Sequence, residues 1–112
     1  MVKVLVSGYG VIGQRLADGV AMQEDMELIG VVDAVPTLTV QTLRDKGMPY
    51  KLFAASDDAT KTFDSAGIPV SGTMTDILPE TDIVLDDKHF KKKSTTTLHK
   101  FTYDLIYRYL GI

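Results

Sequence analysis

Three glycines near the start of the chain have the spacing of a phosphate-binding turn. Gly8, Gly10 and Gly13 form a Gly-x-Gly-x-x-Gly pattern with Tyr9 inside it. The first glycine permits a tight turn from strand to helix, the second lets the backbone approach a pyrophosphate, and the third lets the helix pack closely on the sheet. The N–H groups of residues 10–13 would lack partners within the helix and carry the positive end of its dipole. The pattern therefore predicts a dinucleotide site at this turn.

An acidic residue follows at the distance that such a site requires. Asp33 lies twenty residues after Gly13, at the end of the next apolar run, where a carboxylate can accept hydrogen bonds from the hydroxyls of the adenosine ribose. The same carboxylate would repel a 2′-phosphate, so we expect NAD as the cofactor, with NADP possible because Arg44 and Lys46 lie close in sequence. An alternative for the glycine pattern is an ordinary strand-to-helix turn in which the glycines serve only packing. An alternative for Asp33 is a solvated turn residue that contacts no cofactor.

The elements around the glycine turn have the order of a βαβ unit. Val2 to Val6 is a short apolar run typical of a buried strand, and Val11 to Met22 has helical periodicity. We expect Ile12, Leu16 and Val20, with Ala17 and Ala21 offset, to form the apolar face of that helix. Met26 to Val32 is a second apolar run that ends at Asp33. A strand, turn, helix and strand in this order predict a right-handed crossover between parallel strands.

Strands and helices continue to alternate up to residue 86. The expected elements are a helix over Thr37–Lys46, a strand over Tyr50–Ala54, a helix capped by Ser56 and closed by Gly67, a short edge strand over Ile68–Val70, one helical turn over Thr75–Leu78 and a buried strand over Asp82–Asp86. This alternation predicts an α/β fold with a doubly wound, mostly parallel, Rossmann-like sheet that carries helices on both faces.

The last part of the chain differs in character from the rest. Four lysines and a histidine occur between residues 88 and 93, where they could bind phosphates or form solvated surface. Leu98, Phe101, Leu105 and Tyr109 then recur at helical spacing, which predicts an amphipathic helix at about 95–110. Its apolar stripe would pack on the core or form a dimer seam, so a homo-oligomer is possible. We expect one domain over 1–112 with a divergent tail over 87–112.

Composition narrows the range of functions. The net charge of −3 argues against a dedicated nucleic-acid binder, and the apolar runs are too short to span a membrane. The N-terminus does not have the pattern of a signal peptide, so we expect a cytoplasmic protein. The sequence has no cysteine, which excludes disulfides and a cysteine nucleophile in this chain. With only two histidines, no metal site is expected.

Several separate segments resemble the archaeal-type phosphorylating glyceraldehyde-3-phosphate dehydrogenases. These segments are SGYGVIGQRLAD from Ser7, QEDMELIGV from Gln23, AGIPVSGT from Ala66 and DIVLD from Asp82. The similarity runs in register over about residues 1–86. It implies the N-terminal NAD(P)-binding domain of an oxidoreductase of glycolysis or gluconeogenesis. It also implies that Val11 and Ile12 lie on the cofactor.

The chain departs from the family pattern at three places. Ser7 stands where family members often have Asn, and Asp33-Ala34 stands where they often have Lys-Thr suited to NADP. From Asp87 onward the family's Gly-rich loop and second domain are missing, including a catalytic Cys in a Ser-Cys-Asn-Thr-Thr motif and a His base. In that family the thiolate attacks an aldehyde, hydride passes to the nicotinamide and phosphate cleaves the thioester. The run over 94–97 does not match that motif.

Three functional hypotheses remain open from the sequence. The first is a module that binds NAD but cannot oxidise an aldehyde by the family route. The second is a fragment of an active dehydrogenase that a missing domain completes. The third is a dimeric structural or regulatory relative with a vestigial site. The gene product could be truncated, could be a domain with an added tail, or could be a stand-alone relative whose C-terminal helix covers the surface where the second domain docks.

Overall fold

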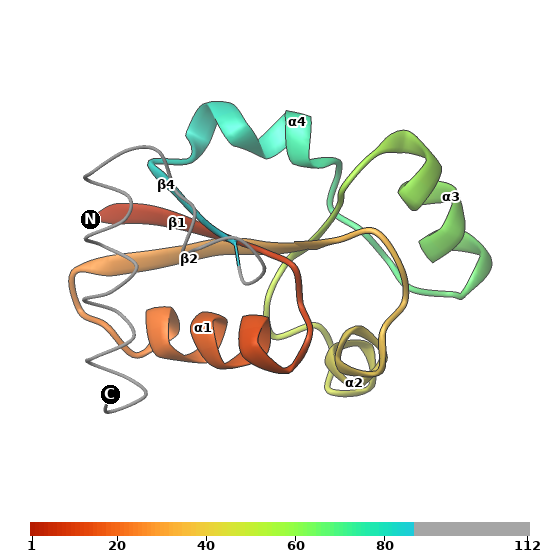
Figure 1. Ribbon diagram of the computed structural model, residues 1–112, viewed down its shortest axis with the longest axis horizontal. Helices are drawn as coiled ribbons and strands as arrows, with labels where there is room; N and C mark the ends of the chain where they lie inside the picture. Colours follow the sequence, from red (N-terminus) through yellow and green to blue (C-terminus); the bar gives the residue numbers. More distant parts are fainter. Residues whose placement is uncertain (87–112) are drawn as a thin grey trace.

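A parallel sheet forms the centre of the computed structural model, which describes residues 1–86. Its strands are β1 (Val2–Ser7), β2 (Met26–Asp33), β3 (Leu52–Ala54) and β4 (Ile83–Asp86). The four strands are all parallel and lie in the order β3-β2-β1-β4 (Figure 1). The predicted α/β fold with a parallel sheet is confirmed. The predicted C-terminal helix at about 95–110 lies outside the described residues.

Helices cover both faces of this sheet. They are α1 (Val11–Ala21), α2 (Leu38–Asp45), α3 (Asp57–Ser65) and α4 (Met74–Ile77), which continues into the 3₁₀ helix η1 (Leu78–Glu80). Figure 1 shows α1 and α2 on one side of the sheet and α4 on the other. The strand order changes direction at β1, because β2 and β3 lie on one side of it and β4 on the other. Such reversal points, at the carboxyl ends of the strands, are where Rossmann-like folds bind ligands.

Side-chain caps begin two of the helices, at Ser56, where the sequence predicts a cap, and at Thr37, which the sequence places inside the helix. The Thr37 side chain accepts a hydrogen bond from the Val40 N–H at the start of α2, and Ser56 does the same for the Ala59 N–H in α3, both at 3.2 Å. Each cap satisfies an N–H group that the first helical turn leaves without a partner. The start of α1 differs, because its cap residue is Gly10 and no side chain caps it.

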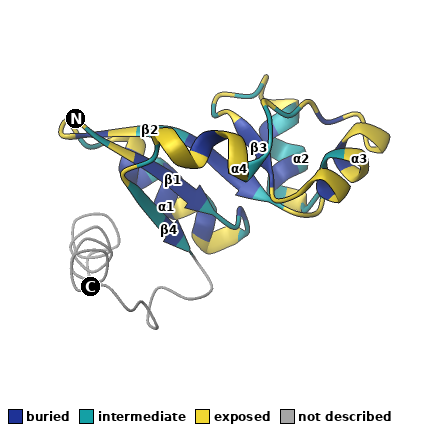
Figure 2. Ribbon diagram, turned by 90° about the horizontal axis from the view of Figure 1, so that it is seen from above, coloured by how far each residue is buried: buried dark blue, intermediate teal, exposed yellow. Residues whose placement is uncertain are grey.

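The sheet has a cluster of buried side chains on each face. Val4 and Val6 on β1 belong to the larger cluster with Leu16 of α1, whereas Leu5 between them belongs to the smaller cluster with Val32 and others. This alternation follows from the pleat of a strand, which sends successive side chains to opposite faces. Figure 2 shows the buried residues concentrated on the strands and on the inner sides of the helices. These two clusters fix the position of α1 against the sheet, and with it the turn that joins β1 to α1.

One predicted strand is wrong in position. The sequence predicts an edge strand over Ile68–Val70, but those residues form no regular element. The chain reaches the edge of β3 later, where the Ser71 N–H donates to the Leu52 carbonyl at 2.8 Å and the Ala54 N–H donates to the Gly72 carbonyl at 2.9 Å. Only one parallel bridge forms, between Ala54 and Thr73. Pro69 has no N–H to donate, which disfavours pairing earlier in the segment.

The predicted apolar face of α1 is also partly wrong. Leu16, Ala17 and Val20 are buried as expected, but 49% of Ile12 is exposed, and Ala21 at the end of the helix is exposed as well. The buried face includes Gly13, Leu16 and Val20, so Ile12 falls at its edge in the first turn of the helix. The apolar side chain of Ile12 is therefore available at the end of the helix where the resemblance places the cofactor.

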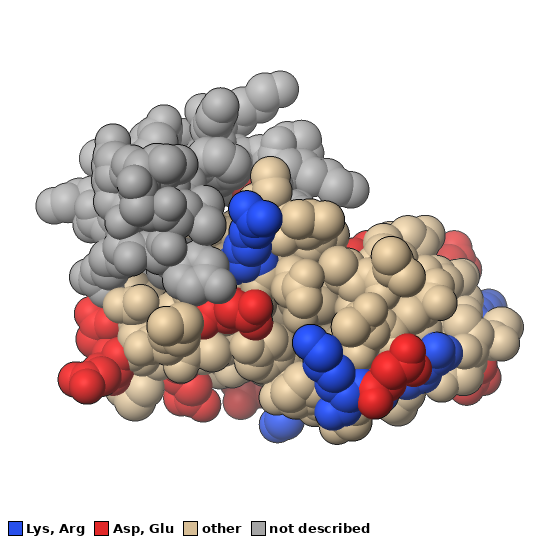
Figure 3. Space-filling view, turned by 90° about the horizontal axis from the view of Figure 1, so that it is seen from below, with Lys and Arg blue, Asp and Glu red and all other residues tan. Residues whose placement is uncertain are grey.

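The surface of the described residues carries charges of both signs. Seen from the side of α1 and α2, acidic and basic side chains lie interspersed (Figure 3). Within residues 1–86, no helix is both long enough and apolar enough to cross a membrane. Over the same residues, no group of three or more His, Cys, Asp or Glu side chains has a geometry suited to a metal ion.

Candidate functional site

The glycine turn joins β1 to α1 through a conformation that favours glycine. Gly8 has a φ of 91°, in the left-handed region that other residues rarely adopt. Its N–H donates to the Val32 carbonyl of β2 at 2.7 Å, so the turn begins in contact with the neighbouring strand. The sequence assigns Gly8 the tight turn from strand to helix, and this backbone conformation agrees with that assignment.

The first turn of α1 presents backbone donors without a capping side chain. Gly10 is the cap residue, with φ −85° and ψ −160°, and its carbonyl accepts the N–H of Gln14 at 2.9 Å. Among residues 1–86, no hydrogen bond takes up the Gly10 N–H. The next N–H groups belong to the first turn, where the helix supplies no partner four residues earlier. No acidic residue lies in that turn, so no side chain of the helix itself offsets its positive potential.

Two apolar side chains flank these donors. Val11 is 64% exposed and Ile12 is 49% exposed, in a first turn where Gly13 is buried against the sheet. Isolated exposed apolar residues are common on protein surfaces. Here they adjoin unpaired backbone donors, which is the mixture of apolar surface and a few oriented polar groups that ligand sites present.

Asp33 lies directly against the glycine turn. Its Oδ2 accepts the Tyr9 N–H at 2.9 Å and its Oδ1 accepts the Ala34 N–H at 2.7 Å. The Val35 N–H also donates to Oδ1, at 3.5 Å. A carboxylate has about four lone-pair sites, so these three bonds leave capacity for a further donor such as a ribose hydroxyl. The structure thus brings together the turn and the carboxylate that sequence analysis assigns to one site, although they are about twenty residues apart in the chain.

Two threonines that sequence analysis does not assign to the site also contact the turn. The Thr37 hydroxyl donates to the Tyr9 carbonyl at 3.3 Å, and the Thr39 hydroxyl donates to the same oxygen. The only local signal is that Thr37 begins a predicted helix after Asp33. That signal predicts the helix but not a contact with a turn some thirty residues earlier.

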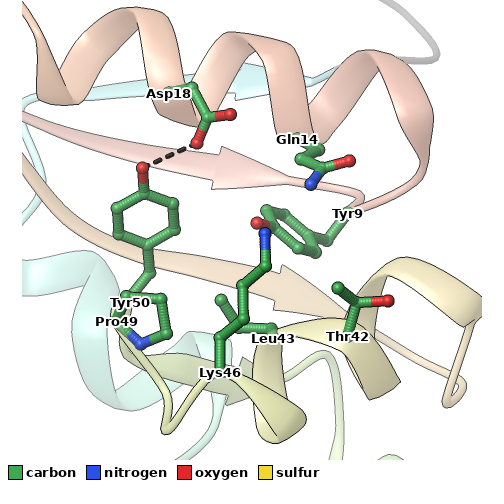
Figure 4. A pocket seen from close by; sticks show the side chains of 8 residues that line it. All are labelled: Tyr9, Gln14, Asp18, Thr42, Leu43, Lys46, Pro49 and Tyr50. Carbon is green, nitrogen blue, oxygen red and sulfur yellow. Dashed lines mark hydrogen bonds between the residues drawn. The ribbon is translucent and has the colours of Figure 1, made fainter.

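The side chain of Tyr9 points away from the donors of α1 and into the space between α1 and α2. It is 2% exposed and lines a pocket of about 120 Å³. Figure 4 shows the side chains that line this pocket, which are Tyr9, Gln14, Asp18, Thr42, Leu43, Lys46, Pro49 and Tyr50. The Tyr50 hydroxyl donates to Asp18 Oδ1 at 2.6 Å across it. Tyr9 therefore offers its backbone, rather than its ring, to the candidate cofactor site.

Burial, followed by the nearby Asp18 carboxylate, raises the pKa of the Tyr9 phenol to about 12. An unfolded tyrosine ionises near pH 10, so the stabilising effect is complete below that pH and is lost as the pH rises towards 12. We expect the free energy of unfolding to fall by roughly 2 kcal/mol more in the wild-type chain than in Tyr9→Phe over this interval. Urea unfolding of both proteins at several pH values measures this. Asp18, Lys46 and Tyr50 are present in both proteins, so a difference between them reports on the Tyr9 phenol. If the free energy of unfolding changed equally with pH in the two proteins, the raised pKa of Tyr9 would be contradicted.

The two basic residues that complicate the choice of cofactor lie elsewhere. Arg44 contacts Asp45 through its Nε at 3.2 Å and donates to the Ala66 carbonyl at 3.3 Å. Lys46 lines the pocket between α1 and α2 (Figure 4). The contacts of Arg44 are therefore with Asp45 and Ala66 rather than with the Asp33 carboxylate.

Comparison with known proteins gives relatives of one kind. A glyceraldehyde-3-phosphate dehydrogenase of Methanococcus maripaludis is 50% identical over 86 residues, which cover 77% of this chain and 25% of the relative. The enzyme of Thermococcus kodakarensis is 42% identical over 85 residues. The enzyme of Methanocaldococcus jannaschii is 46% identical over 102 residues, or 88% of this chain, so that alignment extends past residue 86. No family model matches the chain.

The matches cover most of this chain but only the N-terminal part of each relative. The chain spans between a quarter and a third of the length of these relatives, with coverages of 25% and 29%. The matched stretch, about residues 1–86 at 42–50% identity, is the part of the chain that holds the glycine turn, α1 and the four strands. Over about residues 1–86, the chain is homologous to the N-terminal quarter of archaeal glyceraldehyde-3-phosphate dehydrogenases.

Proposed function

We propose that this chain is a nicotinamide dinucleotide-binding module, with the diphosphate at the start of α1 and the adenosine ribose at Asp33. Gly8, Gly10 and Gly13 shape the turn, while Tyr9 contributes its backbone. Val11 and Ile12 offer apolar contact to the cofactor. This assignment combines the geometry of the turn with homology to dehydrogenases, and the bound cofactor would supply hydride chemistry.

One observation supports this proposal more than the others. The Gly10 N–H has no partner within residues 1–86, and it begins a helix that has neither a side-chain cap nor an acidic first turn. In contrast, α3 has a serine cap with Asp57 and Asp58 in its first turn. A diphosphate would supply both the acceptors and the negative charge that α1 lacks.

Isothermal titration of the full chain with NAD tests the proposed function. We expect saturable heat with one dinucleotide per chain, together with a rise in Tm that follows the NAD concentration. The absence of both heat and a thermal shift at millimolar NAD would contradict the proposal. That result would favour the alternative of a structural or regulatory relative with a vestigial site.

The position of Asp33 further supports NAD as the preferred cofactor. A carboxylate at the ribose hydroxyls repels a 2′-phosphate, and the Arg44 guanidinium contacts Asp45 and donates to the Ala66 carbonyl. We expect Asp33→Asn to lower the ratio of the Kd for NADP to the Kd for NAD by about tenfold, or roughly 1.4 kcal/mol. Paired titrations with both dinucleotides measure this ratio. The exposed Asp64→Asn on α3 is the matched control, and a ratio unchanged in Asp33→Asn would contradict the proposed preference.

A second candidate function follows from the length of the relatives. The matched part is only 25–29% of each relative, so the chain could form the cofactor domain of a dehydrogenase whose catalytic domain is supplied separately. Because this chain has no cysteine, it cannot form the family's thioester by itself. We expect no turnover of glyceraldehyde-3-phosphate with phosphate and NAD by the isolated chain. A neighbouring reading frame that encodes a Ser-Cys-Asn-Thr-Thr segment would support the second candidate.

A further inference from the structure

We propose that Asp33, Thr37 and Thr39 form a clamp on the two peptide groups of Tyr9 and thereby aim the Gly10 N–H at the diphosphate. In this proposal Thr37 and Thr39 are positioning residues, which act on the ligand through the backbone of the turn. The proposal rests on the proposed function, because it concerns the same dinucleotide site. We call these three side chains the Tyr9 clamp.

The first half of the Tyr9 clamp holds the carbonyl of Tyr9. The hydroxyls of Thr37 and Thr39 both donate to this oxygen, and they lie 3.0 Å from each other. The donors are 28 and 30 residues away from Tyr9 in the sequence. Threonine hydroxyls more often bond a carbonyl three or four residues earlier in their own helix, as Thr42 does with Leu38. These two contacts instead tie the start of α2 to the glycine turn.

The planarity of the peptide bond converts this contact into an orientation for Gly10. In a trans peptide the C=O of one residue and the N–H of the next lie in one plane and point in opposite directions. The described residues contain no cis peptide bond. Because the Tyr9 carbonyl points at the two threonines, the Gly10 N–H must point away from them. That N–H has no partner among the residues that the structure describes.

The second half of the Tyr9 clamp holds the preceding peptide group. The Tyr9 N–H donates to Asp33 Oδ2 at 2.9 Å, and the Tyr9 side chain is only 2% exposed between α1 and α2. Tyr9 is therefore restrained on both sides of its backbone and at its ring. Rotation of the Tyr9–Gly10 peptide would break the threonine contacts. A donor that is fixed before the ligand arrives loses less entropy on binding than a mobile one.

Valine is the appropriate replacement for these threonines, because it keeps the branched shape and removes only the hydroxyl. We expect Thr37→Val/Thr39→Val to raise the Kd for NAD by about tenfold. The single variant Thr39→Val, which leaves the Thr37 cap of α2 intact, should raise it by about threefold. Thr39→Ser should restore wild-type affinity because it restores the hydroxyl. Thr62→Val is the matched control, since it removes an exposed hydroxyl that bonds a carbonyl four residues earlier in α3, away from the turn.

Titration with three ligands shows whether Thr37 and Thr39 orient the diphosphate-binding N–H or only support the fold in general. NAD and ADP carry a diphosphate, whereas adenosine does not, so titration with all three shows whether the loss is confined to the diphosphate. We expect weaker binding of NAD and ADP by the double variant, with adenosine binding within about twofold of wild type. Urea unfolding shows whether each variant is folded. If the double variant does not fold, the single variant Thr39→Val carries the comparison of the three ligands.

Two outcomes would overturn the proposed clamp. One is a folded Thr39→Val that binds NAD as the wild type does. The other is a loss of affinity that is the same for adenosine as for NAD. These outcomes differ from failure of the proposed function, in which the wild-type chain itself binds neither NAD nor ADP.

Discussion

Replacing Gly10 with valine is expected to weaken NAD binding by about 100-fold, or nearly 3 kcal/mol, while the chain remains folded. The backbone of Gly10 has φ −85° and ψ −160°, a conformation that residues other than glycine also adopt. The substitution should therefore cause little strain in the free protein. Its branched side chain would occupy the space through which the diphosphate approaches the backbone. Titration calorimetry with NAD measures the loss.

A matched substitution distinguishes this steric effect from damage to α1. Ala21→Val adds bulk at the exposed C-terminal end of the same helix and should leave the Kd for NAD within about twofold of wild type. If Gly10→Val were folded and bound NAD with unchanged affinity, the diphosphate could not lie against the backbone at Gly10. The proposed location of the cofactor would then be wrong.

Phe63→Ala is expected to produce the largest loss of stability, about 4 kcal/mol in the free energy of unfolding. Phe63 on α3 is completely buried, and it belongs to the larger core cluster with Leu52 of β3 and Val4 of β1. Truncation would leave a cavity between α3 and the sheet. For a domain of this size the loss is a large fraction of the total stability. Urea unfolding followed by circular dichroism measures it.

The control for this prediction is an apolar residue that lies outside the core. Leu38 is 79% exposed at the start of α2, so Leu38→Ala should change the free energy of unfolding by less than about 0.5 kcal/mol. A loss below about 1 kcal/mol for Phe63→Ala would contradict the burial of this side chain.

The parts of the fold that the sequence predicts well are those with a strong local signal. The strands over Val2–Ser7 and Met26–Asp33 are nearly continuous apolar runs, which is the pattern of parallel strands buried on both faces. Ser56 precedes a helix and caps it, as its residue type predicts. These features depend on neighbours in the chain, so the sequence pattern is sufficient to find them.

The errors occur where the sheet, rather than the local sequence, decides the outcome. The apolar segment Ile68–Val70 has the composition of a strand, but the edge of β3 meets the chain only at 71–73. Ile12 fits the helical period of the buried face, yet it lies in the first turn and remains 49% exposed. In both cases the sequence pattern identifies an apolar segment or helix face correctly. It does not show how far along the chain that segment or face stays in contact with the sheet.

In the candidate site, too, some features follow from the local sequence and others depend on how the elements pack. The glycine spacing and the position of Asp33 predict which residues lie together, because a βαβ unit places the ends of its strands side by side. The contacts of Thr37 and Thr39 with the Tyr9 carbonyl could not be predicted in this way. Hydroxyl groups can bond many partners, and the choice here depends on how α2 packs beside the turn.

Titration of ¹⁵N-labelled full chain with NAD, followed by the amide resonances, is the most direct test of where the dinucleotide binds. We expect the largest shifts at the N–H groups of residues 10–13, because these would donate to the diphosphate. ADP should shift the same resonances. If NAD left them unchanged, or moved only resonances far from the glycine turn, the unpaired amides at the start of α1 would not be the binding site.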